Sequence, residues 1–338
     1  MEMNLRGAGE SGALAYKDAI FISPHKFIGG PGTPGVLVAK RQLLTNTVPT
    51  VPGGGTVSYV SPAGHTYLTD PAHREEGGTP AIIEAIRAGL VFHLKDAVGA
   101  ANIEQLEKCF VDRAITAWSA DPDIRILGNL KAKRLSIVSF VIRRGDRLLH
   151  HNFVVALLND LFGIQARGGC SCAGPYGHRL LGIDLAHSER FHAAINGGCE
   201  GIKPGWVRVN FNYFISEAVF DFVIAAVRFV ARDGWRFLPD YDFDPHTGIW
   251  RHRAAHRGDT LSLDDVTYRT GRMAWNTHHR VAPEGALDGY LLEAARLAAA
   301  RAAAGPGAAG ADVPAAALPP LPNEFESLRW FPLPGDTD

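Results

Sequence analysis

The sequence predicts an α/β fold class, because short apolar strands alternate with helices along most of the chain. Two apolar runs, residues 19–23 and 35–39, predict short buried strands on either side of a glycine-rich turn. A helix is expected over residues 79–95. Strict alternation over residues 135–142 and an apolar helix over 153–162 then predict a second, compact α+β unit.

The first helix and its successor follow from apolar spacing. Ile82, Ile86 and Leu90 recur at helical intervals, which places them on one stripe of the helix. Gly99 is expected to interrupt the helix, because glycine disfavours a helix interior. A linking helix should then run on through Phe110.

The later elements have recognisable ends. Gly163 follows the apolar helix as a C-terminal stop. Residues 206–211 predict a strand, and a helix over 216–232 stopped by Gly234 completes the α+β unit. An alanine-rich helix is expected over residues 286–304.

Composition excludes several classes of protein. The chain has 338 residues, 46% hydrophobic content and a formal net charge of −1, which suits one or two ordinary cores and does not indicate a nucleic-acid partner. It has no apolar run of membrane length, and residues 1–6 lack the apolar region of a signal peptide, so we expect a cytoplasmic location. The cysteines do not form a dense disulfide framework and stand at positions 109, 170, 172 and 199.

Lys26 is the first candidate for chemistry. It follows an apolar strand and precedes the glycine-rich residues 29–32. A lysine amine becomes a nucleophile where a dry pocket or a nearby cation lowers its pKa, and His25 with the apolar residues 27–28 are candidates for these roles. Together with Ser23, the turn suits an aldehyde that carries a phosphate. The alternative is a solvent-exposed lysine at a strand end.

The order of the motifs identifies a family. Ser-x-His-Lys at residues 23–26, followed by Gly-Gly-Pro-Gly at 29–32, resembles the pyridoxal-phosphate lysine motif of the class V aminotransferases. This family includes cysteine desulfurases and selenocysteine lyases. Residues 52–56 are similar to the glycine loop that follows the lysine, and residues 74–80 are similar to the family's Glu-x-Gly-Thr-Pro segment.

The resemblance assigns roles to these residues. It implies that Lys26 binds pyridoxal 5′-phosphate as a Schiff base, while Ser23 and His25 hold the phosphate. It also implies that Thr79 reaches the cofactor phosphate of a neighbouring subunit, in a homodimer with a shared active site. We expect Thr79 to be a helix N-cap with Pro80 at the first helical position. The alternative is a cap with no contact to a cofactor.

A polar loop over residues 167–175 is the second candidate site. Its Arg-x4-Cys-Ala-x-Pro pattern is similar to the mobile loop of the desulfurases, which implies that Cys172 takes sulfur or selenium from the substrate as a persulfide. A sulfur acceptor protein would then be a partner. Two alternatives remain: Cys170 and Cys172 could be metal ligands or a redox pair. Cys-x-Cys without a second cysteine pair is a weak signal for a metal site, so we predict no metal.

Arg208 is the candidate for binding a carboxylate. It lies in the middle of the apolar strand 206–211, which resembles the family's Val-Arg-x-Ser/Asn strand. The resemblance implies that Arg208, together with Arg167, binds the α-carboxylate of an amino-acid substrate, since a guanidinium forms a bidentate pair with a carboxylate. A structural ion pair is the alternative.

The resemblance also implies a domain organisation. Residues 1–105 would be the remaining part of a pyridoxal-phosphate-binding large domain of fold type I, which is aspartate aminotransferase-like. Residues 106–240 would be the small C-terminal α+β domain, and 241–338 a surface extension with an Ala/Pro/Gly-rich linker and a tail. Because few residues precede Lys26, we expect an N-terminally truncated chain with exposed strand edges and apolar helix faces, or a partner chain that supplies the missing half. Residues 325–334 are apolar enough to dock onto the body.

Three hypotheses for function follow. The first is a pyridoxal-phosphate enzyme like a cysteine desulfurase or selenocysteine lyase, which removes sulfur or selenium from a small amino acid. The second keeps the fold but assigns an aminotransferase or another lyase reaction in which Cys172 is not used. The third is an inactive fragment or a non-catalytic subunit.

Overall fold

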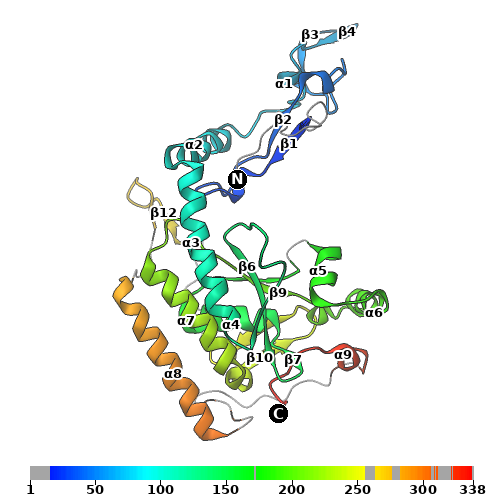
Figure 1. Ribbon diagram of the computed structural model, residues 1–338. Helices are drawn as coiled ribbons and strands as arrows, with labels where there is room; N and C mark the ends of the chain where they lie inside the picture. The colour runs from blue at the N-terminus through cyan, green and yellow to red at the C-terminus, as the bar shows by residue number, and fades with distance from the viewer. Residues whose placement is uncertain are drawn as a thin grey trace. The chain divides into compact units, whose positions relative to one another are not determined.

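The computed structural model describes residues 16–170, 173–255, 263–275, 282–305, 308, 310, 321 and 323–336 (Figure 1). The chain divides into two units between Gln105 and Leu106, and each unit is described by itself. Helices and strands both contribute to the fold, which confirms the α/β class. Within the described residues, no helix is both long and apolar enough to span a membrane.

The first unit contains two antiparallel hairpins. Strand β1 (Ala19–Ile22) pairs with β2 (Val36–Ala39), and β3 (Val57–Ser61) pairs with β4 (Gly64–Tyr67). A short helix, α1 (Pro71–Arg74), follows. The β3–β4 hairpin was not expected from the sequence.

The apolar strands of this unit are not buried, contrary to expectation. The side chain of Phe21 is 83% exposed and that of Leu37 is 53% exposed. Among the described residues, β1 and β2 form a sheet of only two strands, which is too small to cover its own apolar side chains. The expectation of exposed apolar helix faces is confirmed, since Ile82, Ile86 and Leu90 are each more than half exposed.

Helix α2 (Ile82–Val98) begins three residues later than expected. Its N-cap is Ala81, which has no side chain that can accept a hydrogen bond, so the prediction of Thr79 as N-cap is wrong. A residue before proline is extended both at an N-cap and in an ordinary extended segment, so the Thr-Pro pattern did not determine where the helix begins. The break at Gly99 is confirmed: Gly99 has φ 85°, and α3 (Ala100–Ser119) begins directly after it.

The second unit is built on an antiparallel sheet. Its strands are β5 (Ile124–Ile126), β6 (Ile137–Arg144), β7 (Arg147–Leu148), β8 (Arg167–Gly169) and β9 (Trp206–Asn210). The order is β5-β6-β9-β8, and β7 forms a hairpin with β6. Alternate residues of β6 face opposite sides, so Val138 and Phe140 join one apolar cluster and Val141 joins another.

Three helices supply the main core against this sheet. They are α3, α4 (His151–Phe162) and α7 (Glu217–Asp233), and their apolar faces pack with Phe140 of β6. Gly163 ends α4 in the left-handed conformation, as predicted, and the Ser216 hydroxyl caps α7 by accepting from the Val219 amide. Helices α5 (Gly174–Leu181) and α6 (Leu185–Asn196) follow the cysteine loop.

The C-terminal residues add to the same core. Two hairpins, one helix and a short terminal helix make up this region: β10 (Tyr241–Asp244), β11 (Ile249–His252), β12 (Val266–Thr267), β13 (Ala274–Trp275), α8 (Leu287–Ala304) and α9 (Asn323–Leu328). Phe325, Phe331 and Leu333 are buried in the main cluster, which confirms that the tail docks.

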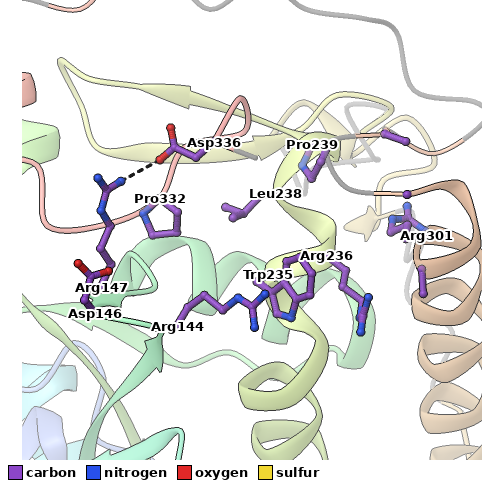
Figure 2. Close-up of a pocket in the computed structure, with 14 residues that line it drawn as sticks. Arg144, Asp146, Arg147, Trp235, Arg236, Leu238, Pro239, Arg301, Pro332 and Asp336 are labelled. Carbon is purple, nitrogen blue, oxygen red and sulfur yellow. Dashed lines mark hydrogen bonds and ion pairs between the residues drawn. The ribbon is translucent and has the colours of Figure 1, made fainter. Parts of the chain in front are cut away.

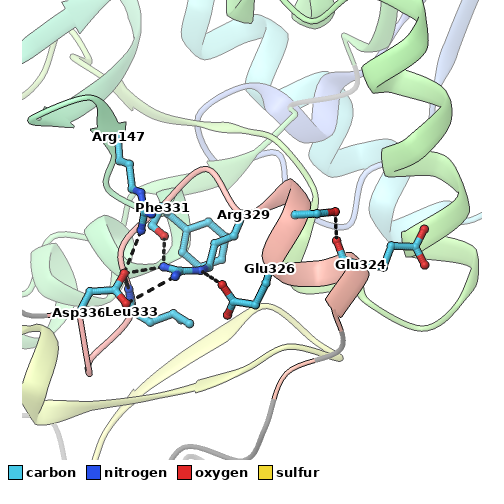
Figure 3. A network of polar contacts seen from close by, with 8 residues as sticks. Arg147, Glu324, Glu326, Arg329, Phe331, Leu333 and Asp336 are labelled. Carbon is cyan, nitrogen blue, oxygen red and sulfur yellow. Dashed lines mark hydrogen bonds and ion pairs between the residues drawn. The ribbon is translucent and has the colours of Figure 1, made fainter.

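Polar contacts hold the docked tail in place (Figure 3). The Trp330 indole N–H donates to the Ile202 carbonyl over 2.9 Å. Arg147 Nη1 lies 3.0 Å from an Asp336 carboxylate oxygen, and Arg329 pairs with both Asp336 and Glu326. Because Arg147 belongs to the β6–β7 hairpin, the tail is tied to the sheet as well as to the apolar core.

Candidate active site

Lys26 ends a single 3-10 turn, Pro24–Lys26, directly after β1. The Lys26 amide donates to the Ser23 carbonyl (3.1 Å), and the Phe27 amide donates to the Pro24 carbonyl (2.8 Å). The Phe27 ring packs edge-on against Phe92 of α2, with centroids 5.1 Å apart. Packing against α2 therefore fixes the backbone of the turn.

The described residues of this unit leave the Lys26 side chain exposed. We expected residues 27–28 to contribute dry surroundings for the amine, but Phe27 points to α2 instead and Ile28 is itself 39% exposed. His25 is also exposed. The turn thus presents its amine and imidazole outward rather than enclosing them.

Glycines make the tight path after Lys26 possible. A Cβ at Gly30 would lie 2.0 Å from the Pro24 carbonyl oxygen, a distance that no side chain tolerates. Gly29 and Gly32 have φ of 77° and 84°, in the region that favours glycine. Arg87 of α2 donates to the Pro31 carbonyl over 2.8 Å and so fastens the far side of the loop.

The donor set of the turn fits an aldehyde that carries a phosphate. Ser23 occupies the N-cap position without a capping hydrogen bond, so its hydroxyl is available to a ligand. Thr33, whose amide donates to the Gly30 carbonyl, has a buried hydroxyl without a hydrogen-bond partner. A primary amine, two hydroxyls and the His25 imidazole thus occur together within eleven residues.

Two glycine loops meet next to Thr79. A Cβ at Gly53 would lie 1.8 Å from the Gly77 carbonyl oxygen, and a Cβ at Gly77 would lie 2.6 Å from the Val51 carbonyl oxygen. These contacts require glycine because the two backbones touch. The segments 52–56 and 74–80, which the sequence singled out separately, are therefore packed together, and the exposed Thr79 follows their contact.

Glu75 anchors this pair of loops. Its carboxylate accepts from the Thr50 amide (3.0 Å) and from the Asn46 side-chain amide (2.7 Å). These hydrogen bonds, the one from Thr50 first, hold the pKa of Glu75 below its usual value. The neighbouring Arg74 is buried and donates to the carbonyls of Leu68 and Thr69. These supporting contacts had no signal in the sequence beyond the place of Arg74 and Glu75 in the Thr79 segment.

The two arginines predicted to bind a carboxylate are brought together. Strand β8 pairs antiparallel with β9 in a register that sets Arg167 directly opposite Arg208. Residues directly opposite each other lie on the same face of the sheet. Among the described residues, the half-buried Arg208 side chain has no ion-pair partner, while the flanking Val207 and Val209 are buried. This face of the sheet therefore carries two guanidinium groups, a group that can form a bidentate pair with a carboxylate.

Cys172 lies outside the described residues, as does Ser171. Its neighbours are placed: Cys170 is a half-buried free thiol, and Ala173 is the N-cap of α5. In the part of the chain that the structure describes, no group of three or more His, Cys, Asp or Glu residues has the arrangement of a metal site.

A family model for class V aminotransferases matches residues 15–196, which is more than half of the chain. The chain belongs to this family. The match includes the lysine turn, Thr79 and Arg167, and it ends before Arg208.

Two curated relatives of the chain are named as cysteine desulfurases. The chain is 31% identical over 158 residues to a cysteine desulfurase of Cronobacter sakazakii, covering 47% of this chain and 37% of the relative. It is 31% identical over 193 residues to a probable cysteine desulfurase of Streptomyces coelicolor, covering 52% and 45%. The chain therefore spans less than half the length of these relatives.

A solved structure shows the same fold. The apo structure of a cysteine desulfurase from Thermococcus onnurineus NA1 matches with a TM-score of 0.50 and 28% identity, over 64% of this chain and 47% of that one. Together with the family match, this likeness supports a partial fold type I architecture for the chain.

His151 supports the strand that carries Arg167. A Cβ at Gly168 would lie 3.0 Å from the His151 ring, and a Cβ at Gly205 would lie 2.9 Å from it, so β8 and the residue before β9 pass the ring closely. Burial lowers the pKa of His151 to about 4, and its Nδ1 is buried without a partner. Sequence analysis did not select this neutral histidine, because two adjacent histidines at a helix start match no motif with a known structural role.

Proposed function

We propose that this chain provides the lysine, arginines and cysteine of a pyridoxal-phosphate enzyme that removes sulfur or selenium from an amino acid. The observation that carries the proposal is the lysine turn: an exposed Lys26 amine beside an uncommitted Ser23 hydroxyl and the His25 imidazole, in a member of the class V aminotransferase family. The cysteine desulfurases among its relatives support this substrate class.

The residues of the first unit would hold the cofactor. Lys26 would attach it covalently through its amine and later carry the proton of the substrate's α-carbon. Ser23 and His25 would donate hydrogen bonds to its phosphate, and Thr79 would do so across a homodimer interface. When bound, pyridoxal 5′-phosphate supplies an electron sink for the substrate.

The residues of the second unit would hold the substrate and take its sulfur. Arg208 and Arg167 face the same side of the sheet and would bind the α-carboxylate between them. The Cys172 thiolate would attack the substrate sulfur, so that an S–S bond forms as the C–S bond breaks and the amino-acid carbon takes a proton. A sulfur acceptor protein would then remove the sulfur from the persulfide. We also propose a cytoplasmic location for the chain.

Covalent labelling tests the role of Lys26. The purified chain is incubated with pyridoxal 5′-phosphate, reduced with borohydride and digested, and the labelled peptide is identified by mass spectrometry. We expect the label on Lys26 and its complete loss in Lys26→Ala. The control Lys17→Ala, which removes another exposed lysine, should keep the full label. A label that persists unchanged in Lys26→Ala contradicts the cofactor assignment.

Sulfide release tests the reaction type. We expect Cys172→Ser to abolish sulfide release from cysteine while leaving the Lys26 label intact, because the thiolate acts only after the substrate is bound. Cys170→Ser, two residues away, is the matched control and should retain activity. Unchanged sulfide release in Cys172→Ser would contradict the desulfurase assignment and favour a lyase reaction in which Cys172 is not used.

A further inference from the structure

A cavity of about 390 Å³ lies in the second unit and shares no residue with the candidate active site (Figure 2). The β6–β7 hairpin, the segment after α7, the end of α8 and the docked tail form its walls. The lining residues are Arg144, Gly145, Asp146, Arg147, Trp235, Arg236, Leu238, Pro239, Arg301, Ala302, Gly305, Ala308, Pro332 and Asp336, and we call this site the arginine cavity.

Four of the lining residues are arginines and two are aspartates. Three of the arginines have carboxylate partners: Arg147 with Asp336 at 3.0 Å, Arg236 with Asp233 at 3.2 Å, and Arg301 with the buried Asp240. Each of these pairs uses only part of the five-donor fork of a guanidinium. The three pairs are formally neutral and Asp146 offsets the charge of Arg144, so the wall offers unused guanidinium donors rather than an excess of positive charge.

Arg144 is the arginine with no carboxylate partner among the described residues. Its guanidinium lies over the Trp235 ring, 3.8 Å from the centroid, and the Arg236 guanidinium lies 4.7 Å from the same centroid. Figure 2 shows the Arg144 side chain extended toward Trp235. Stacking on a ring holds a guanidinium in place while its in-plane N–H donors stay available to a ligand.

The hairpin places a second cation beside Arg144. Arg144 and Arg147 are directly opposite each other in the β6–β7 ladder, joined by the turn of Gly145 (φ 59°) and Asp146. Like charges directly opposite each other destabilise a ladder. Asp336 already offsets the charge of Arg147, and an anion bound at Arg144 would offset the second charge.

We propose that the arginine cavity binds a small phosphorylated anion. A phosphate group has more than one negative charge and several acceptor oxygens, so it can pair with Arg144 and also accept from unused guanidinium donors of the cavity wall. The volume of the cavity lies in the range of small-molecule sites, and Leu238, Pro239 and Pro332 supply apolar wall for an organic part of the ligand.

Isothermal titration calorimetry of the full chain with inorganic pyrophosphate tests this proposal. We expect Arg144→Gln to weaken binding by about tenfold or more, because a charge-assisted pair is lost. Arg143→Gln is the matched control: it removes the same charge from the neighbouring β6 residue, whose side chain donates to the Pro122 carbonyl and does not line the cavity. Binding to this variant should stay within about twofold of the unsubstituted chain.

Further measurements separate this site from the lysine turn and from a general charge effect. Binding of pyrophosphate should persist in Lys26→Ala, and Arg144→Lys should fall between Arg144→Gln and the unsubstituted chain, since lysine keeps the charge but not the fork. The proposal is supported if ADP binds at least as tightly as pyrophosphate. The proposal is overturned if pyrophosphate does not bind, if both glutamine variants lose binding equally, or if citrate binds as tightly as pyrophosphate.

Discussion

Acidification should destabilise the second unit through His151, and the effect can be sized from its burial. His151 is neutral in the fold, where burial lowers its pKa from 6.5 to about 4. Below pH 6.5 the unfolded chain takes up a proton that the folded chain refuses, so the free energy of unfolding falls as pH decreases toward 4. Each pKa unit corresponds to about 1.4 kcal/mol, so the full effect is on the order of 3 kcal/mol, with about 2 kcal/mol reached at pH 5.

The neighbouring His150 strengthens the same trend. It is fully buried, its Nε2 donates to the Gly201 carbonyl, and its Nδ1 accepts from the Asn152 amide, a pattern that only the neutral ring satisfies. Burial first, and the charge of a protonated His151 second, hold the pKa of His150 well below 6.5. The docked Trp330 ring stacks on both histidines and helps to exclude water from them.

Urea unfolding monitored by tryptophan fluorescence measures this effect in the second unit alone, because all six tryptophans follow Leu106. We expect His151→Phe, which keeps a stacked ring but cannot titrate, to reduce the loss of unfolding free energy between pH 7 and 5 by about 2 kcal/mol. The exposed His192→Phe is the control and should keep the full loss. The reasoning is refuted if His151→Phe and the unsubstituted chain lose the same free energy over this pH range.

Three further predictions concern particular contacts. Gly30→Ala should abolish cofactor labelling of Lys26, since its Cβ would lie 2.0 Å from the Pro24 carbonyl oxygen, without shifting the tryptophan-monitored urea midpoint. Asp240→Asn should lower the unfolding free energy of the second unit by about 3–5 kcal/mol, because it leaves the Arg301 charge buried and unpaired, and an unchanged midpoint would contradict this. Ser216→Ala should cost about 1 kcal/mol in the same assay through loss of the α7 cap, whereas Ser216→Asn should retain most of the stability.

Local signals in the sequence were sufficient to predict where several helices begin or end. Gly163 ends α4 and Ser216 caps α7, because these ends depend on the conformation and side chain of one residue. Thr79 shows the limit of such signals: the hydroxyl and the following proline suit an N-cap, yet the helix begins at Ile82. Burial of Phe21 was also predicted wrongly, since a strand pattern does not reveal how many strands its sheet contains.

The candidate site was predictable as a set of residues but not as an arrangement. Arg167 and Arg208 were each chosen for their own motif, and their opposition depends on the register of two strands separated by α5 and α6. His151 was missed because its role arises from close approach of Gly168 and Gly205, which are distant in sequence. Contacts of this kind depend on tertiary packing that no local pattern encodes.

The unit that carries the Lys26 turn and the unit that carries the arginine strands differ in how much apolar core stabilises them. Among the described residues, the buried hydrophobic side chains of the first unit are Ala88 and Val91, whereas the second unit contains the main aromatic core. The arginine strands β8 and β9 therefore lie on a packed support, while the Lys26 turn depends on glycine geometry and a few contacts to α2. A ligand that binds only the folded turn stabilises it by mass action. We infer that cofactor binding and the order of the first unit are coupled more strongly than substrate binding and the order of the second.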